Sequence, residues 1–339
     1  MELNGETLRF IREHCKDDVR SLALQAPKYP GVDMPVALTQ IAGRQAAAEK
    51  IPSWHEEEGV LYPRHLSLEQ CSSEATARYK ASIIPESSSG TLTDLTGGFG
   101  IDCAFLSPKF HHVTYVERQE VLCEIASHNF PLLGLNHIRI ENKDGIRYLQ
   151  EMSSVDWIFI DPARRDGHGG KTVAIADCEP NVAELESLLL EKAQHVMVKL
   201  SPMLDLSLAI QDLKYVQEAH IVSVNNECKE LLLILGHNTV AAENIPIHCI
   251  NLQTKDGRNT KTTGQFFTFT RGQEAQARGY QRRQGRVEQR SHKDLHGRNP
   301  LCRYAAGQGI CPRQAAKERK EKWLNMFLKQ RISAFPSAD

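Results

Sequence analysis

The sequence predicts an α/β fold built on a mostly parallel sheet, and three patterns predict it. Strand-like apolar runs recur at 91–96, 112–117, 137–142, 155–161, 194–201, 218–225 and 228–235. Helical apolar spacing lies between strands at 101–108, 119–130, 180–192 and 204–214. Such alternation is typical of crossover connections, which join parallel strands. Only residues 225–227 separate the last two strands, and so short a link requires that pair to be antiparallel.

Residues 1–80 precede this alternation and are predicted to be mostly helical. Apolar residues follow helical spacing at 4–11, at 17–24 and at about 35–50. The segment SLEQ at 67–70 resembles a capping box that opens a further helix. Two interpretations of it stay open. It is a structural cap, or it belongs to a helix that covers a ligand, with Gln70, Ser72 and Ser73 facing the site.

The strand at 91–96 runs into a turn that contains Gly97, Gly98 and Gly100. Glycine accepts positive φ and lets the backbone approach a ligand closely. A strand, a glycine-rich turn and a helix form the usual cradle for a nucleotide-like cofactor in α/β folds. The next strand ends in Glu117, 23 positions after Asp94, and a carboxylate about that far along holds ribose hydroxyls in such sites.

The same turn argues against two common nucleotide sites. It lacks the third glycine of G-x-G-x-x-G, and the chain contains no G-x-x-x-x-G-K-[ST] loop. Asp94 lies directly before the turn, where its charge would repel a pyrophosphate but would suit a cationic or amine-bearing ligand. The turn therefore favours S-adenosylmethionine over NAD. An NAD(P)-dependent oxidoreductase stays open as the weakest hypothesis.

With these segments in order, the sequence resembles the class I S-adenosylmethionine-dependent methyltransferases. Residues 94–100 (DLTGGFG) are similar to their first motif, and Glu117 matches the acid that ends their second strand. Residues 142–144 (NKD) match the acidic position near the adenine, and 155–165 (VDWIFIDPARR) match the fourth strand with its catalytic loop. The resemblance covers roughly residues 66–236. It implies a Rossmann-like sheet whose last strand is antiparallel.

The resemblance also implies which residues hold S-adenosylmethionine. They are Asp94, Thr96, Gly97, Gly98, Phe99, Gly100, Asp102, Glu117, Arg118 and Asp144.

A narrower resemblance comes from the segment before the first motif. Residues 62–80 (YPRHLSLEQCSSEATARYK), followed by that motif, resemble a family of bacterial THUMP-like-domain methyltransferases. Members carry a C-terminal ferredoxin-like and THUMP-like region, which implies an RNA substrate, either rRNA or tRNA. We therefore expect an N-terminal helical region over 1–80, the methyltransferase domain over 81–236 and an incomplete C-terminal region over 237–339.

The fourth strand leads into the candidate catalytic residues. It ends at Asp161, followed by Pro162, Ala163 and Arg164. Relatives that methylate exocyclic amines have an Asn/Asp-Pro-Pro-aromatic sequence there, in which the acid accepts hydrogen bonds from the amine. Arg164 stands in place of the aromatic residue and can stack on a base or hold a phosphate. Alternatively, Asp161 is a loop acid that only caps a neighbouring group.

The fifth strand contributes Lys199, which we expect to pair with Asp161 or to contact a substrate phosphate. Enzymes that methylate pyrimidine C5 require a cysteine thiolate, but Ser201 occupies the corresponding place here. Cys178 has acidic neighbours, which disfavour a thiolate. We therefore predict direct attack on the methyl group by a substrate nitrogen or oxygen. The glycine-rich segment 166–171 is a candidate lid or entry loop.

Cysteine and histidine usage predicts no metal and a reducing compartment. None of the nine cysteines forms a C-x-x-C pair, and His111, His112 and His168 lack metal-ligand spacing. The N-terminus shows no signal peptide, and no apolar run is long enough to span a membrane. We therefore expect a cytoplasmic protein.

Charge divides the chain unevenly. Residues 1–270 carry 25 Lys and Arg against 36 Asp and Glu, whereas residues 271–338 carry 16 against 5. Apolar periodicity also stops after Arg271. This tail is a basic RNA-binding arm, or it is an aberrant reading frame or a truncation that replaces the THUMP-like region. Two functions stay open: a methyltransferase that acts on RNA, and a non-catalytic RNA-binding protein that keeps the fold.

Overall fold

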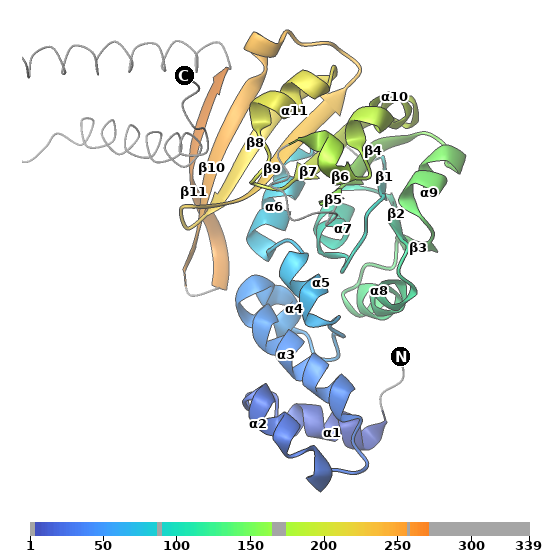
Figure 1. Cartoon of the computed structure of the whole chain (residues 1–339), viewed down its shortest axis with the longest axis vertical. Coiled ribbons are helices and arrows are strands. Elements are labelled where there is room, and N and C mark those ends of the chain that lie inside the picture. Colours follow the sequence, from blue (N-terminus) through green and yellow to red (C-terminus); the bar gives the residue numbers. More distant parts are fainter. Residues whose placement is uncertain (1–3, 87–89, 165–173, 256–257, 271–339) are drawn as a thin grey trace, which may run out of the picture. The chain divides into compact units, whose positions relative to one another are not determined.

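The computed structural model describes residues 4–86, 90–164, 174–255 and 258–270. Its centre is a nine-stranded sheet with the strand order β11-β10-β8-β9-β7-β4-β1-β2-β3 (Figure 1). The strands are β1 Thr91–Asp94, β2 His112–Glu117, β3 Ile138–Asn142, β4 Val155–Ile160, β7 Ala193–Leu200, β8 Val216–Val224, β9 Glu227–Gly236, β10 Pro246–Lys255 and β11 Arg258–Thr270. A separate small sheet pairs β5 Ala163–Arg164 with β6 Cys178–Glu179.

Strand directions confirm the predicted fold class. Strands β3, β2, β1, β4 and β7 run parallel to one another, whereas β9 is antiparallel to both β7 and β8. The turn between β8 and β9 places Asn225 at φ 50° and Asn226 at φ 69°. Asparagine tolerates this left-handed conformation, and two such residues in succession form the tight turn that joins antiparallel strands.

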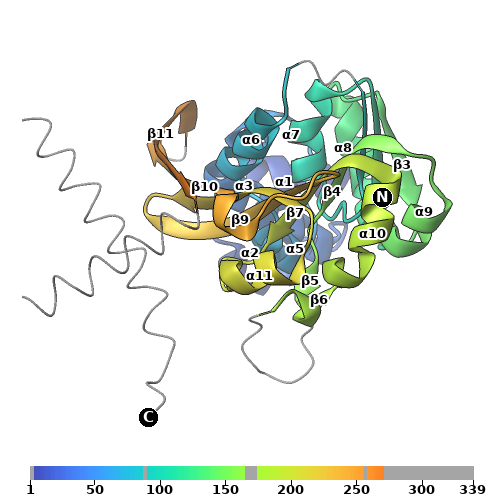
Figure 2. The same ribbon diagram turned by 90° about the horizontal axis from the view of Figure 1, so that it is seen from above.

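Helices cover both faces of the sheet. They are α7 Ile101–Leu106, α8 Glu120–Leu132, α9 Gly145–Glu151, α10 Val182–Lys192 and α11 Leu206–Asp212, with short 3-10 turns at Ser107–Lys109, Ile175–Asp177 and Ala242–Asn244. Figure 2 shows α7 and α8 on one face and α10 and α11 on the other. Helix α9 and the strands β5 and β6 were not predicted; the two strands have only two residues each, too few to establish a period.

The N-terminal part is helical, as predicted. It contains α1 Gly5–Glu13, α2 Val19–Leu24, α3 Met34–Lys50, α4 Pro52–Glu56, α5 His65–Gln70 and α6 Glu74–Ile83, with a 3-10 turn at Ala26–Lys28. The predicted capping box at Ser67 is wrong, because α5 has already begun at His65 and ends at Gln70. The side-chain cap belongs to the next helix, where the Ser73 hydroxyl accepts the backbone N–H of Thr76.

One aromatic cluster joins this helical part to the sheet. The ring of Phe99, from the glycine-rich turn, lies 5.1 Å from the ring of Trp54 and 6.2 Å from that of Tyr62. The amide of Gln40 bonds both backbone groups of Tyr62, at 2.8 and 2.9 Å. All three rings are buried in a core that continues into the sheet. Residues of α3 and α4 therefore fix the position of the glycine-rich turn through these contacts with Phe99.

Strands β10 and β11 extend the sheet beyond the predicted boundary at residue 236. Strand β10 pairs parallel with β8, and β11 pairs antiparallel with β10. The basic segment 271–339 lies outside the described residues, so the hypothesis of an altered tail stays a prediction. In the part of the chain that the structure describes, no helix has both the length and the apolar character needed to cross a membrane.

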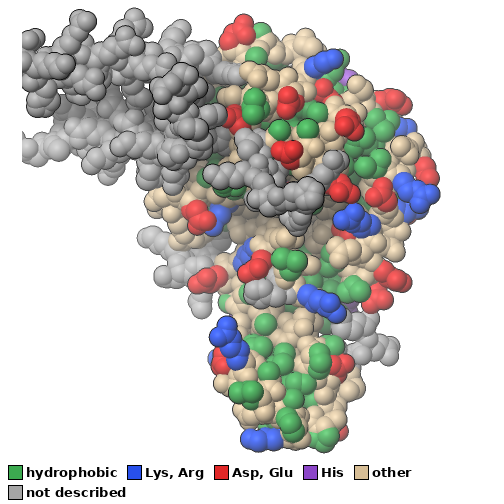
Figure 3. All heavy atoms as spheres, viewed as in Figure 1, with side chains coloured by type: hydrophobic (Ala, Val, Ile, Leu, Met, Phe, Trp, Pro, Cys, Tyr) green, Lys and Arg blue, Asp and Glu red, His purple; other side chains and the backbone are tan. Residues whose placement is uncertain are grey.

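The described surface carries both signs of charge. Figure 3 shows Lys and Arg side chains interspersed with Asp and Glu over one face of the described residues. Residues 1–270 contain more acidic than basic side chains, 36 against 25. The excess of basic over acidic residues therefore lies in residues 271–338.

Substitution of Gly43 tests how closely α3 packs against Tyr62. A Cβ atom at Gly43 would lie 2.3 Å from the Cβ of Tyr62, which cannot move without displacing the backbone. We expect Gly43→Ala to lower the free energy of unfolding by about 1–3 kcal/mol, measured by urea denaturation. Gly5→Ala is the matched control, because no atom lies within 4 Å of its added Cβ. Equal stability of the two variants would contradict this packing.

Candidate active site

A cavity of about 850 Å³ opens at the carboxyl ends of β1, β2, β4 and β7. This edge is where open α/β sheets bind ligands, and the volume suits a cofactor-sized molecule. The cavity is lined by all ten predicted cofactor residues and by three of the four predicted catalytic ones: Asp94, Thr96, Gly97, Gly98, Phe99, Gly100, Asp102, Glu117, Arg118, Asp144, Asp161, Pro162 and Lys199. The side chain of the fourth, Arg164, lies outside the described part, as do residues 165–173 with the candidate lid.

The glycine-rich turn is fastened to β2. The Gly97 N–H donates to the Val116 carbonyl at 2.9 Å, and a Cβ atom at Gly97 would lie 2.2 Å from the Tyr115 ring. Gly98 adopts φ +54°, and its N–H donates to Glu117 Oε2 at 2.8 Å. The Tyr115 hydroxyl donates to the Gly98 carbonyl. The turn therefore needs glycine at 97 for close approach and at 98 for its conformation.

Asp94 places a buried carboxylate beneath this turn. Its Oδ1 accepts the Thr96 N–H at 3.0 Å, whereas its Oδ2 is buried without a hydrogen-bond partner. Burial raises the pKa of Asp94 well above its usual value, and the nearby carboxylates of Asp102, Asp161 and Glu117 raise it further. A buried oxygen without a partner requires an explanation, and a positively charged donor bound in the cavity would supply one.

Glu117 is oriented by the backbone around it. Its Oε2 accepts the Gly98 N–H and its Oε1 accepts the Gln119 N–H, both at 2.8 Å. Each oxygen keeps a further lone pair, so the carboxylate can still accept two hydroxyl groups. Its neighbour Arg118 is exposed and reaches 4.0 Å from Glu179 at the cavity rim.

The next part of the cavity wall is apolar and capped by an acid. Asp144 Oδ1 accepts the N–H groups of Ile146 and Arg147, which makes Asp144 the N-cap of α9. Leu122, Ile146 and Leu149 line the same region. This wall suits the faces and edge of a flat heterocycle. Sequence reasoning found the acid but not the apolar residues, since they resemble any buried position of an amphipathic helix.

Two predicted cofactor residues direct their side chains into the protein instead. The Phe99 ring packs against Trp54. Asp102 Oδ2 accepts the Ser72 hydroxyl at 2.7 Å, and its Oδ1 lies 3.0 Å from Lys80 Nζ. These residues shape the cavity by holding the turn and α7 in place.

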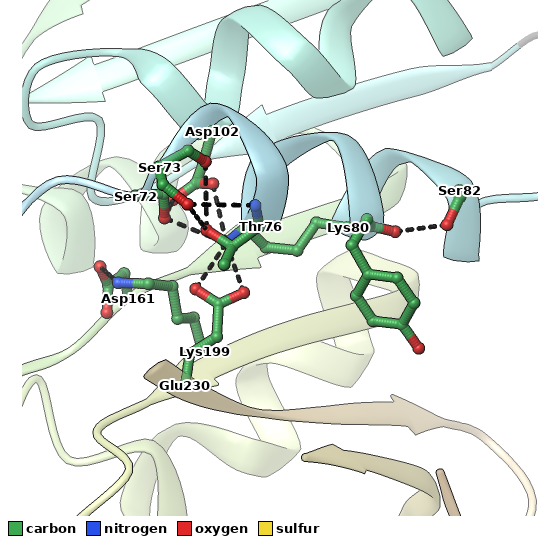
Figure 4. Close-up of polar contacts among 10 residues, drawn as sticks. Ser72, Ser73, Thr76, Lys80, Ser82, Asp102, Asp161, Lys199 and Glu230 are labelled. Carbon is green, nitrogen blue, oxygen red and sulfur yellow. Dashed lines mark hydrogen bonds and ion pairs between the residues drawn. The ribbon is translucent and has the colours of Figure 1, made fainter. Parts of the chain in front are cut away.

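Asp161 and Lys199 form an ion pair at the cavity floor (Figure 4). The Asp161 N–H donates to the Thr96 hydroxyl at 2.7 Å, which connects the loop after β4 to the loop after β1. Burial acts to lower the pKa of Lys199, but the carboxylates of Asp161, Asp102 and Glu230 outweigh it and raise that pKa. Lys199 therefore remains an ammonium and keeps a positive charge against Asp161.

A second lysine, Lys80, which sequence reasoning missed, lies beside Ser72, Asp102 and Glu230 (Figure 4). Lys80 of α6 has no exposed side-chain surface, and its Nζ lies 2.8 Å from both oxygens of Glu230 in β9. The same Nζ donates to the Ser72 hydroxyl at 3.0 Å and contacts Asp102. Burial raises the pKa of Glu230, against the opposing effect of Lys80. One ammonium thus joins α6, α7 and β9.

The cavity offers no activated thiol among the described residues. Cys71 is the one cysteine in its wall, and burial raises the pKa of that thiol to about 11. Cys178 is buried in β6 and does not line the cavity, whereas Ser201 does. This arrangement agrees with the prediction of direct attack, which stays a prediction.

Sequence reasoning singled out no metal site. Among the described residues, the structure groups one set of three potential ligands, Glu218, His220 and His248, away from the cavity. His111 and His112 are exposed and separate from this set, and His168 lies outside the described residues. The pattern Glu-x-His within one strand could have indicated two metal ligands on the same side of that strand. That His248 lies beside them depends on the pairing of β8 with β10, which the sequence does not reveal.

Comparison with known proteins points to one fold. No protein-family model and no curated protein matches the chain. The chain is similar to a crystal structure described as a "putative methyltransferase from Porphyromonas gingivalis W83", at 32% identity and a TM-score of 0.67. The alignment covers 80% of this chain and 65% of that protein, so the chain spans slightly less than two thirds of its length.

The chain has the class I methyltransferase fold. The observed strand order, with the antiparallel β9, and the similarity to this structure agree. Two further structures are similar over smaller parts. The B. subtilis M1A22 tRNA methyltransferase TrmK is 18% identical, with a TM-score of 0.37 over 49% of this chain and 68% of that one. An rRNA methylase from Streptococcus thermophilus is 12% identical, with a TM-score of 0.35. That alignment covers 48% of this chain and 93% of the methylase. The narrower THUMP-like resemblance stays a prediction.

Removing the buried ammonium should destabilise the protein strongly. We expect Lys80→Met to cost about 3–5 kcal/mol of unfolding free energy at pH 7.5, because Asp102 and Glu230 then lose their buried counter-charge. The deficit should shrink as the pH falls, because burial raises the pKa of Glu230 and its carboxyl then takes up a proton. Lys109→Met is the control, since its partner Glu86 is exposed and the pair contributes about 1 kcal/mol or less. Similar losses in both variants would contradict the network.

Proposed function

We propose that this protein transfers a methyl group from S-adenosylmethionine to a nucleotide of RNA, by direct attack of a substrate nitrogen or oxygen. The observation that carries the proposal is the buried Asp94 oxygen without a partner. It lies in the wall of a cavity that also contains the oriented Glu117 and the Asp161–Lys199 pair. Together these groups match a ligand with an ammonium group, a ribose and a reactive methyl group.

The residues present fit S-adenosylmethionine. Asp94 can hold the amino group of its methionine part, because a buried carboxylate favours a positive partner. Glu117 can accept both ribose hydroxyls, and Asp144 can meet the polar edge of an adenine that rests on the apolar wall. When bound, the cofactor supplies an electrophilic methyl group on a sulfonium. The neighbouring carboxylates suit that positive charge.

Asp161 is the candidate catalytic residue. The bound cofactor would supply the methyl group and keep the electron pair of its C–S bond, and the attacking substrate nitrogen or oxygen would lose a proton. Asp161 Oδ1 or Oδ2 can accept the hydrogen bond that aligns the nucleophile and can receive that proton. Lys199 holds the Asp161 carboxylate in place through their ion pair. A thiolate nucleophile is unnecessary for this reaction.

RNA as the substrate is supported by charge and by resemblance. Residues 271–338 carry 16 basic against 5 acidic side chains, a composition that favours binding to phosphate backbones. The segment at 62–80 resembles a family for which an RNA substrate is implied. A non-catalytic RNA-binding protein on this fold would share the charge but would not transfer methyl groups.

Cofactor binding should depend on pH through Asp94. Its folded pKa is raised, so the carboxyl is neutral at low pH and gains the charge that attracts an ammonium as pH rises. We expect affinity for S-adenosylmethionine to increase as the pH rises above the ordinary range of a carboxyl group, measured by calorimetry. Asp94→Asn should weaken binding about 10-fold at pH 7.5 and remove the increase.

Three further titrations complete that experiment. Glu117→Gln should weaken binding by a similar factor, because its amide group no longer accepts both ribose hydroxyls. Asp212→Asn, at an exposed position of α11, should bind as the wild type does. NAD should not bind. Tight binding of NAD, or an Asp94→Asn variant as tight as the wild type at pH 7.5, would overturn the cofactor assignment.

Methyl transfer is tested with labelled cofactor and RNA from a strain that lacks the gene. We expect label in one RNA fraction with the wild type, and a rate about 100-fold lower with Asp161→Asn although the cofactor still binds. Asp212→Asn again serves as the control. Cofactor binding without transfer to any RNA fraction would favour the non-catalytic hypothesis instead.

A further inference from the structure

Three potential metal ligands meet on the outer strands of the sheet. Glu218 and His220 are two residues apart on β8, so they face the same side. His248 is paired directly with His220 across the parallel β8–β10 ladder. The two imidazole rings stack with their centroids 4.7 Å apart at 24°. Strands β8, β10 and β11 lie at one edge of the sheet (Figure 1), and none of the three ligands lines the cofactor cavity.

The distances between these side chains are those of groups that share an ion. His248 Nε2 lies 3.3 Å from Glu218 Oε2, and His220 Nε2 lies 3.6 Å from Glu218 Oε1. Both Nε2 atoms are buried and lack a hydrogen-bond partner. Ligands about 2.0–2.1 Å from a tetrahedral Zn²⁺ are separated by about 3.3 Å, close to these values. All three ligand atoms lie within 4.8 Å of one another.

The Nδ1 atom of each imidazole ring already has a hydrogen-bond partner. Tyr79 of α6 places its hydroxyl 2.8 Å from His220 Nδ1, and Thr268 of β11 places its hydroxyl 2.9 Å from His248 Nδ1. A hydroxyl oxygen can accept from an Nδ1–H, and in that tautomer Nε2 carries the lone pair. Metal-binding histidines are oriented by such hydrogen bonds at their second nitrogen.

We propose that Glu218, His220 and His248 bind a divalent transition-metal ion of the Zn²⁺ class. Two imidazoles and one carboxylate favour such an ion over Mg²⁺ or Ca²⁺, which prefer oxygen ligands. Three protein ligands leave a position for water, and Glu218 and His248 are partly exposed, so an ion can enter from solvent. The ion cross-links β8 to β10, while the hydrogen bonds to its ligands reach α6 and β11.

The test is metal binding to the full chain, which does not depend on methyl transfer. We expect the wild type to bind one equivalent of Zn²⁺ by calorimetry, and Co²⁺ to give the visible absorption of a tetrahedral site. His248→Gln should weaken Zn²⁺ binding about 100-fold or more, and Tyr79→Phe about 10-fold. His111→Gln, at an exposed histidine elsewhere, should bind as the wild type does. Mg²⁺ should not compete.

Two controls keep the outcome decisive. Circular dichroism and S-adenosylhomocysteine binding show whether His248→Gln remains folded, and Thr268→Val offers a milder change at the same ligand. Zinc should raise the melting temperature of the wild type but not that of His248→Gln. Binding that is equal in the wild type and His248→Gln would assign the ion to another site, such as the tail histidines, and would overturn the proposal. So would wild-type affinity for Zn²⁺ weaker than millimolar.

Discussion

The buried ammonium of Lys80 is the interaction on which the cavity depends. Lys80 belongs to α6, and its ammonium group lies between Glu230 of β9 and Asp102 of α7. These elements are distant in sequence, and each carries a polar group that would be costly to bury alone. Because Asp102 follows the glycine-rich turn directly, the contact also fixes where that turn ends. The aromatic contact of Phe99 with Trp54 holds the turn from the other side.

Negative charge exceeds positive charge around the cavity. Asp94, Glu117 and Asp161 line it, whereas Lys199 is the ammonium that pairs with one of them. Burial, together with repulsion from the neighbouring carboxylates, explains why the pKa of Asp94 is raised. A cofactor with a sulfonium and an ammonium would relieve this imbalance, whereas a pyrophosphate would worsen it. The electrostatics therefore favour the same ligand as the shape of the turn.

The proposed metal site lies at the edge of the sheet, apart from the cofactor cavity. Strands β10 and β11 add to the seven strands expected of the fold, and Glu218, His220 and His248 lie where the first added strand meets β8. An ion there would stabilise the pairing of β10 with β8 without contacting the cofactor cavity. Function at the two places can therefore be separated by experiment.

The sequence by itself determined the seven-strand alternation, the antiparallel last pair and the glycine-rich turn with the acids at the strand ends that line the cavity. These follow from local patterns: apolar periodicity, glycines after a strand, and acids at strand ends. Only the tertiary structure decided that Asp102 faces Lys80, that short elements such as α9 form, and that His248 lies beside His220. Such contacts join residues separated by 22 to 150 positions, for example Lys80 with Glu230, and no local period encodes them. Their physical basis is burial, because a charged or polar group removed from water requires a partner, and the fold decides which one is near.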